Sequence, residues 1–117
     1  MPQTSEQEIQ NQIILAVSQG NSRLFRNNVG GAKLADGRWL NFGLHKGSSD
    51  LIGWKTIEIT PDMVGKKIAQ FLSVEVKKLK GRVSTEQQNW IDVVNTHGGH
   101  ALIARSAEQA TKEINEL

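Results

Sequence analysis

Cysteine and tyrosine are absent from the 117 residues, proline occurs only twice, and no apolar run approaches the length of a membrane span. Without cysteine the chain can form neither disulfides nor thiolate metal sites. A spanning helix needs about 18 consecutive apolar residues, so we predict no membrane contact. The start, MPQTSEQEIQ, lacks the regions of a signal peptide, and we therefore expect a cytoplasmic protein with a single domain over residues 1–117.

The net charge is only +2, but positive residues are concentrated in one part of the chain. Six of them fall between residues 66 and 82: Lys66, Lys67, Lys77, Lys78, Lys80 and Arg82. Such a cluster is typical of a protein that binds a polyanion. A solvated surface explains it equally well.

Hydrophobic periodicity and capping residues predict a mixed α/β fold. A helix over 5–19 is indicated by Ile9, Ile13, Ala16 and Val17, with Ser5 or Thr4 as N-cap and Gly20 at its end. Strand patterns follow at 24–25, 51–59, 68–76 and in ALIAR, residues 101–105; Asp36-Gly37 indicates a hairpin. Two further helices begin after Ser84, which forms a capping-box pattern with Gln87, and after Ser106. We expect a sheet flanked by helices.

The segment FLSVEVKKLKG, residues 71–81, carries the most informative polar residues. On a strand, Leu72, Val74 and Val76 share one face, while Glu75 and Lys77 share the other with Ser73. Asp50, at the start of the preceding long strand, adds a second carboxylate, and two carboxylates suit Mg²⁺ or Mn²⁺. Lys77 would orient a water molecule or neutralise transition-state charge. An acid-x-lysine triplet is nevertheless common, and its ordinary explanation is a surface ion pair.

A wider pattern accompanies this triplet: SEQEIQNQI, LFRNNVG, GLHKGSSDLIGW, ITPDMVGKKIAQFLSVEVKKLKGRVSTEQQNW and GGHALIARS, in this order. It resembles the VRR-NUC (virus-type replication-repair nuclease) family of the PD-(D/E)XK nuclease superfamily. The resemblance implies a restriction-endonuclease-like core with a mixed β-sheet flanked by helices in the order αβββαβ. It also implies that Asp50, Glu75, the Val76 carbonyl and, through a water, Glu6 hold the metal, with Glu6, Asp50, Glu75, Lys77 and Gln87 as catalytic residues. Gln88 is the alternative to Gln87, and Ser49-Asp50 stands in place of the superfamily's Pro-Asp.

The activity implied by the resemblance is Mg²⁺- or Mn²⁺-dependent hydrolysis of DNA phosphodiesters, leaving a 5′-phosphate and a 3′-hydroxyl. Small stand-alone members resemble phage or bacterial enzymes that resolve Holliday junctions as homodimers, which would place this chain in a bacterial cytoplasm. Two alternatives stay open. One is an accessory DNA-binding module with a nuclease fold, and the other is a flap- or end-processing nuclease of phage replication and repair.

Several residues outside the predicted centre are candidates for DNA contacts. The polar and basic ones are Arg26, Asn28, His45, Lys46, Lys66, Lys67, Lys78, Lys80 and Arg82, and their contribution should weaken with salt. Asn28 lies in a glycine-rich segment that can equally be a turn, and His45 can be merely exposed. Trp39, Trp54 and Trp90 can stack on unpaired bases or line a dimer interface, although the helical position of Trp90 favours core packing.

Overall fold

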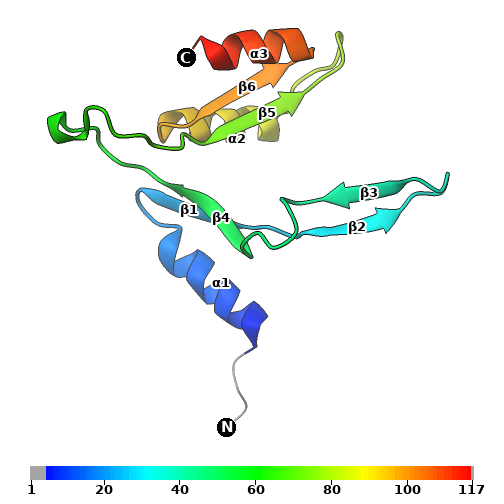
Figure 1. The fold of residues 1–117 in the computed structure, drawn as a ribbon, viewed down its shortest axis with the longest axis horizontal. Coiled ribbons are helices and arrows are strands. Elements are labelled where there is room, and N and C mark those ends of the chain that lie inside the picture. Colours follow the sequence, from blue (N-terminus) through cyan, green and yellow to red (C-terminus); the bar gives the residue numbers. More distant parts are fainter. Residues whose placement is uncertain (1–4, 117) are drawn as a thin grey trace. The chain divides into compact units, whose positions relative to one another are not determined.

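The computed structural model describes residues 5–116 and divides into two compact units, the first ending at Ile57 and the second beginning at Glu58. Helices and strands occur in both, which confirms the mixed α/β class (Figure 1). The strands of the described residues pair as three two-stranded sheets rather than one. The single domain and the core order αβββαβ therefore remain predictions.

The first unit begins with helix α1 (Glu6–Val17), followed by strands β1 (Ser22–Arg26) and β4 (Leu51–Lys55). Ser5 caps the helix as predicted, since its hydroxyl accepts a hydrogen bond from the Glu8 amide at 3.1 Å. Thr4, the alternative cap, lies outside the described residues. Strands β1 and β4 pair antiparallel, with Leu24 opposite Gly53. The predicted apolar stripe of α1 is only half covered, because Ile9 and Ile13 remain 43% and 40% exposed.

A separate hairpin, β2 (Gly30–Lys33) and β3 (Trp39–Phe42), is inserted between β1 and β4. The predicted Asp36-Gly37 turn closes it: Gly37 has a φ of +89°, which favours glycine, and Asp36 accepts from the Arg38 amide at 3.0 Å. Gly30 and Gly31, expected in a turn, are instead strand residues. A side chain at either position would meet an aromatic ring of β3, which would have to move.

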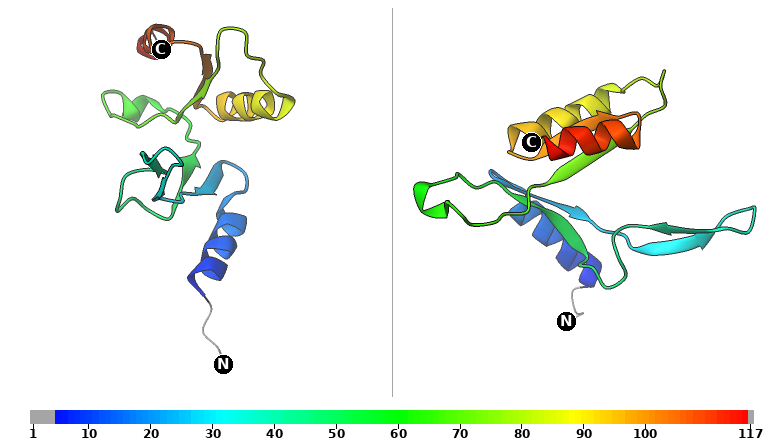
Figure 2. Two further views of the ribbon diagram at one scale, coloured as in Figure 1. Left: turned by 90° about the vertical axis from the view of Figure 1, so that its right-hand side faces the viewer. Right: turned by 45° about the horizontal axis from the view of Figure 1, so that its top comes forward.

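The second unit contains β5 (Leu72–Val76), α2 (Thr85–Thr96), β6 (His100–Ala104) and α3 (Ala107–Asn115), after the 3₁₀ turn η1 (Pro61–Met63). Strands β5 and β6 run parallel, with α2 and α3 on opposite faces of their sheet (Figure 2). The core consists of α2 and β6 residues: Ile91, Val94, Ala101, Leu102 and Ala104. Ser84 and Ser106 cap the two helices as predicted, and Gly98, with a φ of +95°, follows the end of α2.

Strand β5 has its polar face partly covered and its apolar face exposed. Residues alternate between the faces as predicted, but Ser73, Glu75 and Lys77 are the half-buried ones. The apolar face is exposed, with 44% of Leu72 and 75% of Val76 accessible. The physical reason is the placement of the helices: α2 packs on the polar face through hydrogen bonds, whereas α3 covers β6 and leaves β5 open on the other face.

Both long strand predictions were too long. The strand expected over 51–59 ends at Lys55, and the one expected over 68–76 begins at Leu72. The residues between them are mostly exposed, so neither stretch has the two-sided packing that a strand interior needs. In the part of the chain that the structure describes, no helix is both long and apolar enough to traverse a bilayer.

Candidate active site

Glu75, Lys77 and Gln87 form the polar centre of the second unit. The Gln87 side chain donates from Nε2 to Glu75 Oε1 at 2.8 Å, and Lys77 Nζ lies 3.5 Å from the same oxygen. The side chains of Glu75 and Lys77 are 33% and 20% exposed. This partial burial makes their ion pair stronger than a fully solvated surface pair. The carboxylate is thus held by two donors and still reaches solvent.

Gln87 reaches Glu75 because of its place at the start of α2. Its amide N–H donates to Ser84 Oγ at 3.1 Å, and its side-chain Oε1 accepts from the Ser84 amide at 3.0 Å, which is a capping box. With Oε1 committed to the cap, Nε2 is turned toward the strand. Gln88, the alternative at this position, donates instead to Asp92 within the same helix. Gln87 is therefore the glutamine in contact with the strand carboxylate.

Trp90, one turn further along α2, attaches the helix to the same face of β5. Its indole Nε1 donates to Ser73 Oγ at 2.8 Å, and its ring meets Phe71 edge-on at a centroid distance of 6.4 Å. The residue remains 36% exposed, so it packs between the elements rather than in the core as expected. Together with the bond from Gln87 to Glu75, this contact holds the first turns of α2 against β5.

Glu75 and its neighbour Val76 carry oxygen atoms of the type that a hard divalent cation binds. Oε1 accepts from Gln87, whereas Oε2 accepts no hydrogen bond from the residues that the structure describes. The Phe71 carbonyl accepts from the His100 amide, and the Lys77 amide donates to the Ala104 carbonyl, so the odd-numbered residues of this stretch bond to β6. The backbone groups of the even-numbered residues therefore point to the edge of β5 that faces away from β6. The Val76 carbonyl is one of these. A carboxylate oxygen and a backbone carbonyl are donors that Mg²⁺ and Mn²⁺ accept.

Asp50 lies in the first unit, immediately before β4, and its side chain is exposed. The loop that leads to it is held by Asn27, whose amide Oδ1 accepts from Leu44 N and whose Nδ2 donates to Ser48 Oγ and Ser49 O. The Asn27 backbone N–H also donates to the Asp50 carbonyl at 2.8 Å. Asn27 is thus a positioning residue for Asp50 that the sequence did not reveal, because its side-chain partners lie 17 to 22 residues away.

Glu6 is an exposed residue in the first turn of α1, where the helix dipole favours an acid. Within neither unit, counting residues 5–116, do three His, Asp or Glu side chains gather into a metal-binding group. The second unit brings Glu75, Lys77 and Gln87 into contact, whereas their roles and that of the Val76 carbonyl stay predictions. The roles of Asp50 and Glu6 stay predictions.

A basic turn follows β5, and Arg105 organises it. The Arg105 Nη1 donates to the carbonyls of Lys78, Leu79 and Gly81 at 2.5, 3.2 and 3.0 Å. Because β5 and β6 are parallel, their carboxyl ends meet at one edge, which brings Arg105 beside this turn. Arg105 was missed from the sequence, since nothing local distinguishes it from a solvated arginine. These bonds hold the backbone of the turn that carries Lys78 and Lys80, directly after Lys77.

The remaining residues predicted to contact DNA are all exposed, and one has a structural partner. The Arg26 guanidinium donates to Gln10 Oε1 at 2.7 Å and to Asn11 Oδ1, which ties β1 to α1. The others are free of such contacts within the described chain: Asn28, His45, Lys46, Lys66, Lys67 and Arg82. His45 and Lys46 also line a hollow on the β2–β3 hairpin.

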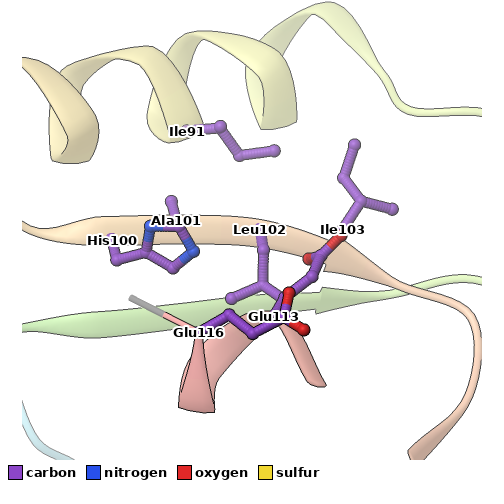
Figure 3. A pocket seen from close by; sticks show the side chains of 7 residues that line it. All are labelled: Ile91, His100, Ala101, Leu102, Ile103, Glu113 and Glu116. Carbon is purple, nitrogen blue, oxygen red and sulfur yellow. The ribbon is translucent and has the colours of Figure 1, made fainter. Parts of the chain in front are cut away.

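A second hollow, of about 430 Å³, lies along β6 in the second unit (Figure 3). Ile91 of α2 lies over Ala101 and Ile103, while Glu113 of α3 and Glu116, just after this helix, project toward the other side of the strand. None of the predicted site residues lines it. His100 and the two glutamates do not constitute a metal-binding group either, so we assign it no function.

The structure brings together the Glu-x-Lys strand and the helix glutamine that the resemblance to a nuclease family predicted as site residues. The model of the VRR-NUC domain matches residues 5–108, nearly the whole chain. The chain therefore belongs to the VRR-NUC family and contains a nuclease domain of the virus-type replication-repair type. Searches of the curated proteins and of the solved structures gave no match.

Proposed function

We propose that this protein is a Mg²⁺- or Mn²⁺-dependent endodeoxyribonuclease that cuts branched DNA, such as Holliday junctions, and leaves a 5′-phosphate and a 3′-hydroxyl. The observation that carries the proposal is the triad of Glu75, Lys77 and Gln87 at the end of β5. In this triad, the side chains of Gln87 and Lys77 both contact the same oxygen of Glu75. Membership of the nuclease family supplies the class of reaction.

Glu75 and Asp50 are the proposed carboxylate ligands, with the Val76 carbonyl as a third oxygen and Glu6 acting through a water. A divalent cation bound there lowers the pKa of a coordinated water and neutralises charge on the phosphoryl group. Gln87 keeps Glu75 oriented, and because its Nε2 occupies Oε1, the other oxygen is left for the cation. The Lys77 ammonium would contact the attacking water or a phosphate oxygen, where charge develops in the transition state.

DNA binding is assigned to the basic residues that flank the triad. Lys78, Lys80 and Arg82 follow it on the turn fixed by Arg105, and Lys66 and Lys67 precede it. In our proposal they contact phosphates rather than bases, so they position the strand without reading its sequence. Affinity should then fall steeply with salt concentration.

The test incubates the protein with Mg²⁺ and end-labelled four-way junction, flap, single-stranded and linear duplex DNA. Wild-type protein should cut the junction fastest, whereas Glu75→Gln and Lys77→Met should lower the rate by at least about 100-fold, as expected for a transition-state contact. Matched controls are Glu58→Gln and Lys112→Met, exposed residues of the same unit. Undiminished cutting by Glu75→Gln would refute the site, and equal cutting of all substrates would refute branched-DNA specificity.

Paired incisions in a junction require two active sites, and we propose that a homodimer supplies them through a self-complementary interface. Sedimentation should show a dimer. Mixing wild-type protein with excess Glu75→Gln protein should convert paired incisions into single-strand nicks. A monomer that still resolves junctions by paired cuts would refute the dimer while leaving the catalytic site unaffected.

A further inference from the structure

The β2–β3 hairpin of the first unit exposes more aromatic and aliphatic surface than folding requires. Every residue of β3 is exposed, including Trp39 at 64%, Leu40 at 49% and Phe42 at 46%. Alternation along β3 puts Trp39 on one face and Leu40 and Phe42 on the other, so the exposed indole of Trp39 and the hollow beside it are the features that indicate a binding surface. The question is which ligand this surface fits.

Trp39 is held in place rather than left mobile. Its ring lies so close to Gly31 that a Cβ built there would fall 2.4 Å from it, and its Nε1 donates to Asn41 Oδ1 at 2.8 Å. The Phe42 ring lies against Gly30 in the same manner, 2.7 Å from a Cβ at that position. Two glycines thus let both rings rest on the backbone of β2. The indole is satisfied by its own strand and keeps most of its surface accessible.

These residues border a hollow of about 810 Å³ that lies wholly within the first unit. Trp39 and Phe42 contribute aromatic surface, Asn41 contributes an amide, and His45 and Lys46 contribute nitrogen donors. The charges on the hairpin are mainly positive, with Lys33 and Lys46 nearby, and its only acid, Asp36, is paired with Arg38 at 2.6 Å. Among residues 5–116, none that lines the hollow carries a side-chain carboxylate.

This combination suits a nucleotide better than an apolar protein surface. A base needs a flat aromatic face and a few hydrogen-bonding groups at its edge, while its phosphate needs a cation close by. Trp39, Asn41 and Lys46 provide these three elements around one hollow. In a symmetric dimer formed through this hairpin, each Lys46 would instead face the mainly positive hairpin of the other copy.

We propose that the hollow on the β2–β3 hairpin binds an unpaired nucleobase of the DNA substrate, stacked on Trp39 and with its adjoining phosphate at Lys46. The proposal rests on DNA being the substrate, but it does not depend on the catalytic triad. It gives the enzyme a reason to prefer DNA whose bases are accessible, as at a junction, flap or single-stranded segment. A continuous duplex offers no base to this site.

The test measures binding of labelled oligothymidine and of a closed, fully paired hairpin duplex with the same number of phosphates, in EDTA so that nothing is cut. Trp39→Ala should weaken oligothymidine binding about 5- to 150-fold, the effect of losing one aromatic stacking platform, and change duplex binding less than about twofold. Trp39→Phe should retain most of the affinity. Leu40→Ala, on the opposite face of β3, is the matched control and should bind like wild type.

A second readout guards against misfolding of Trp39→Ala. Oligothymidine should quench the tryptophan fluorescence of wild-type protein, and the well-tolerated Trp39→Phe change should abolish most of that quenching. Equal losses for both DNAs, unchanged oligothymidine binding, or a change of oligomeric state in Trp39→Ala would each overturn the proposal, the last by identifying a protein interface. If wild-type protein binds through Trp39 but does not cut, only the proposed nuclease activity fails.

Discussion

Replacing Gln87 by glutamate separates the two tasks of this side chain. Glutamate is the usual alternative at this capping-box position, so the acceptor for the Ser84 amide is retained. What changes is the contact with Glu75, since a donor at 2.8 Å becomes a second carboxylate. Two unit charges 4 Å apart repel by about 1 kcal/mol in water and about 4 kcal/mol at an effective dielectric constant of 20.

Because Glu75 is one-third exposed, the lower part of this range applies. We expect Gln87→Glu to lower the free energy of unfolding by about 1 to 2 kcal/mol in EDTA. This figure combines the charge repulsion, the loss of the hydrogen bond to Glu75, and a small opposing gain from a negative charge at the helix N-terminus. At about 4 °C per kcal/mol for a chain of this size, the melting temperature should fall by roughly 4–8 °C. Circular dichroism measures this directly.

Added Mg²⁺ or Mn²⁺ should reverse the effect. Two adjacent carboxylates form a better oxygen site for a divalent cation than one, and a ligand that binds only the folded state raises its stability. The melting temperature of Gln87→Glu should therefore rise more with the metal than that of wild type. Gln88→Glu is the matched control, since Gln88 contacts Asp92 and not Glu75.

Ser84→Ala is the control for the cap, and should cost about 1 kcal/mol without altering the response to metal. The reasoning is refuted if Gln87→Glu is no less stable than Gln88→Glu in EDTA. A metal response equal to that of wild type would refute a cation at Glu75.

Three further predictions concern two residues that hold loops in place and one core residue. Arg105→Met should remove the donors to the turn after β5, lower the stability by about 1 kcal/mol and speed hydrogen exchange at Gly81, whose amide closes that turn; unchanged exchange would contradict the role. Asn27→Ala should cost about 1 to 2 kcal/mol and speed exchange at Leu44, whereas protection equal to wild type would show that the loop is held otherwise. Val94→Ala, at a side chain 1% exposed, should cost about 2 kcal/mol in urea unfolding, and a loss below about 0.5 kcal/mol would mean that Val94 is not core.

The sequence determined the parts of this protein that depend on neighbours along the chain. Ser5, Ser84 and Ser106 cap helices, Asp36-Gly37 closes a hairpin, and alternation puts Glu75 and Lys77 on one face of a strand, all as predicted. Each is a contact between residues at most four positions apart, so the local order of residue types suffices.

Tertiary packing decided what lies against these local features. That α2 covers the polar face of β5, so that Gln87 rather than Gln88 reaches Glu75, depends on the parallel pairing of strands that are 28 residues apart, Leu72 with His100. Asn27 holding the Asp50 loop and Arg105 holding the basic turn are likewise contacts across 17 or more positions. The hydrophobic pattern of β5 alone does not tell which of its faces is covered, because the placement of a helix on a strand depends on the side chains of both elements.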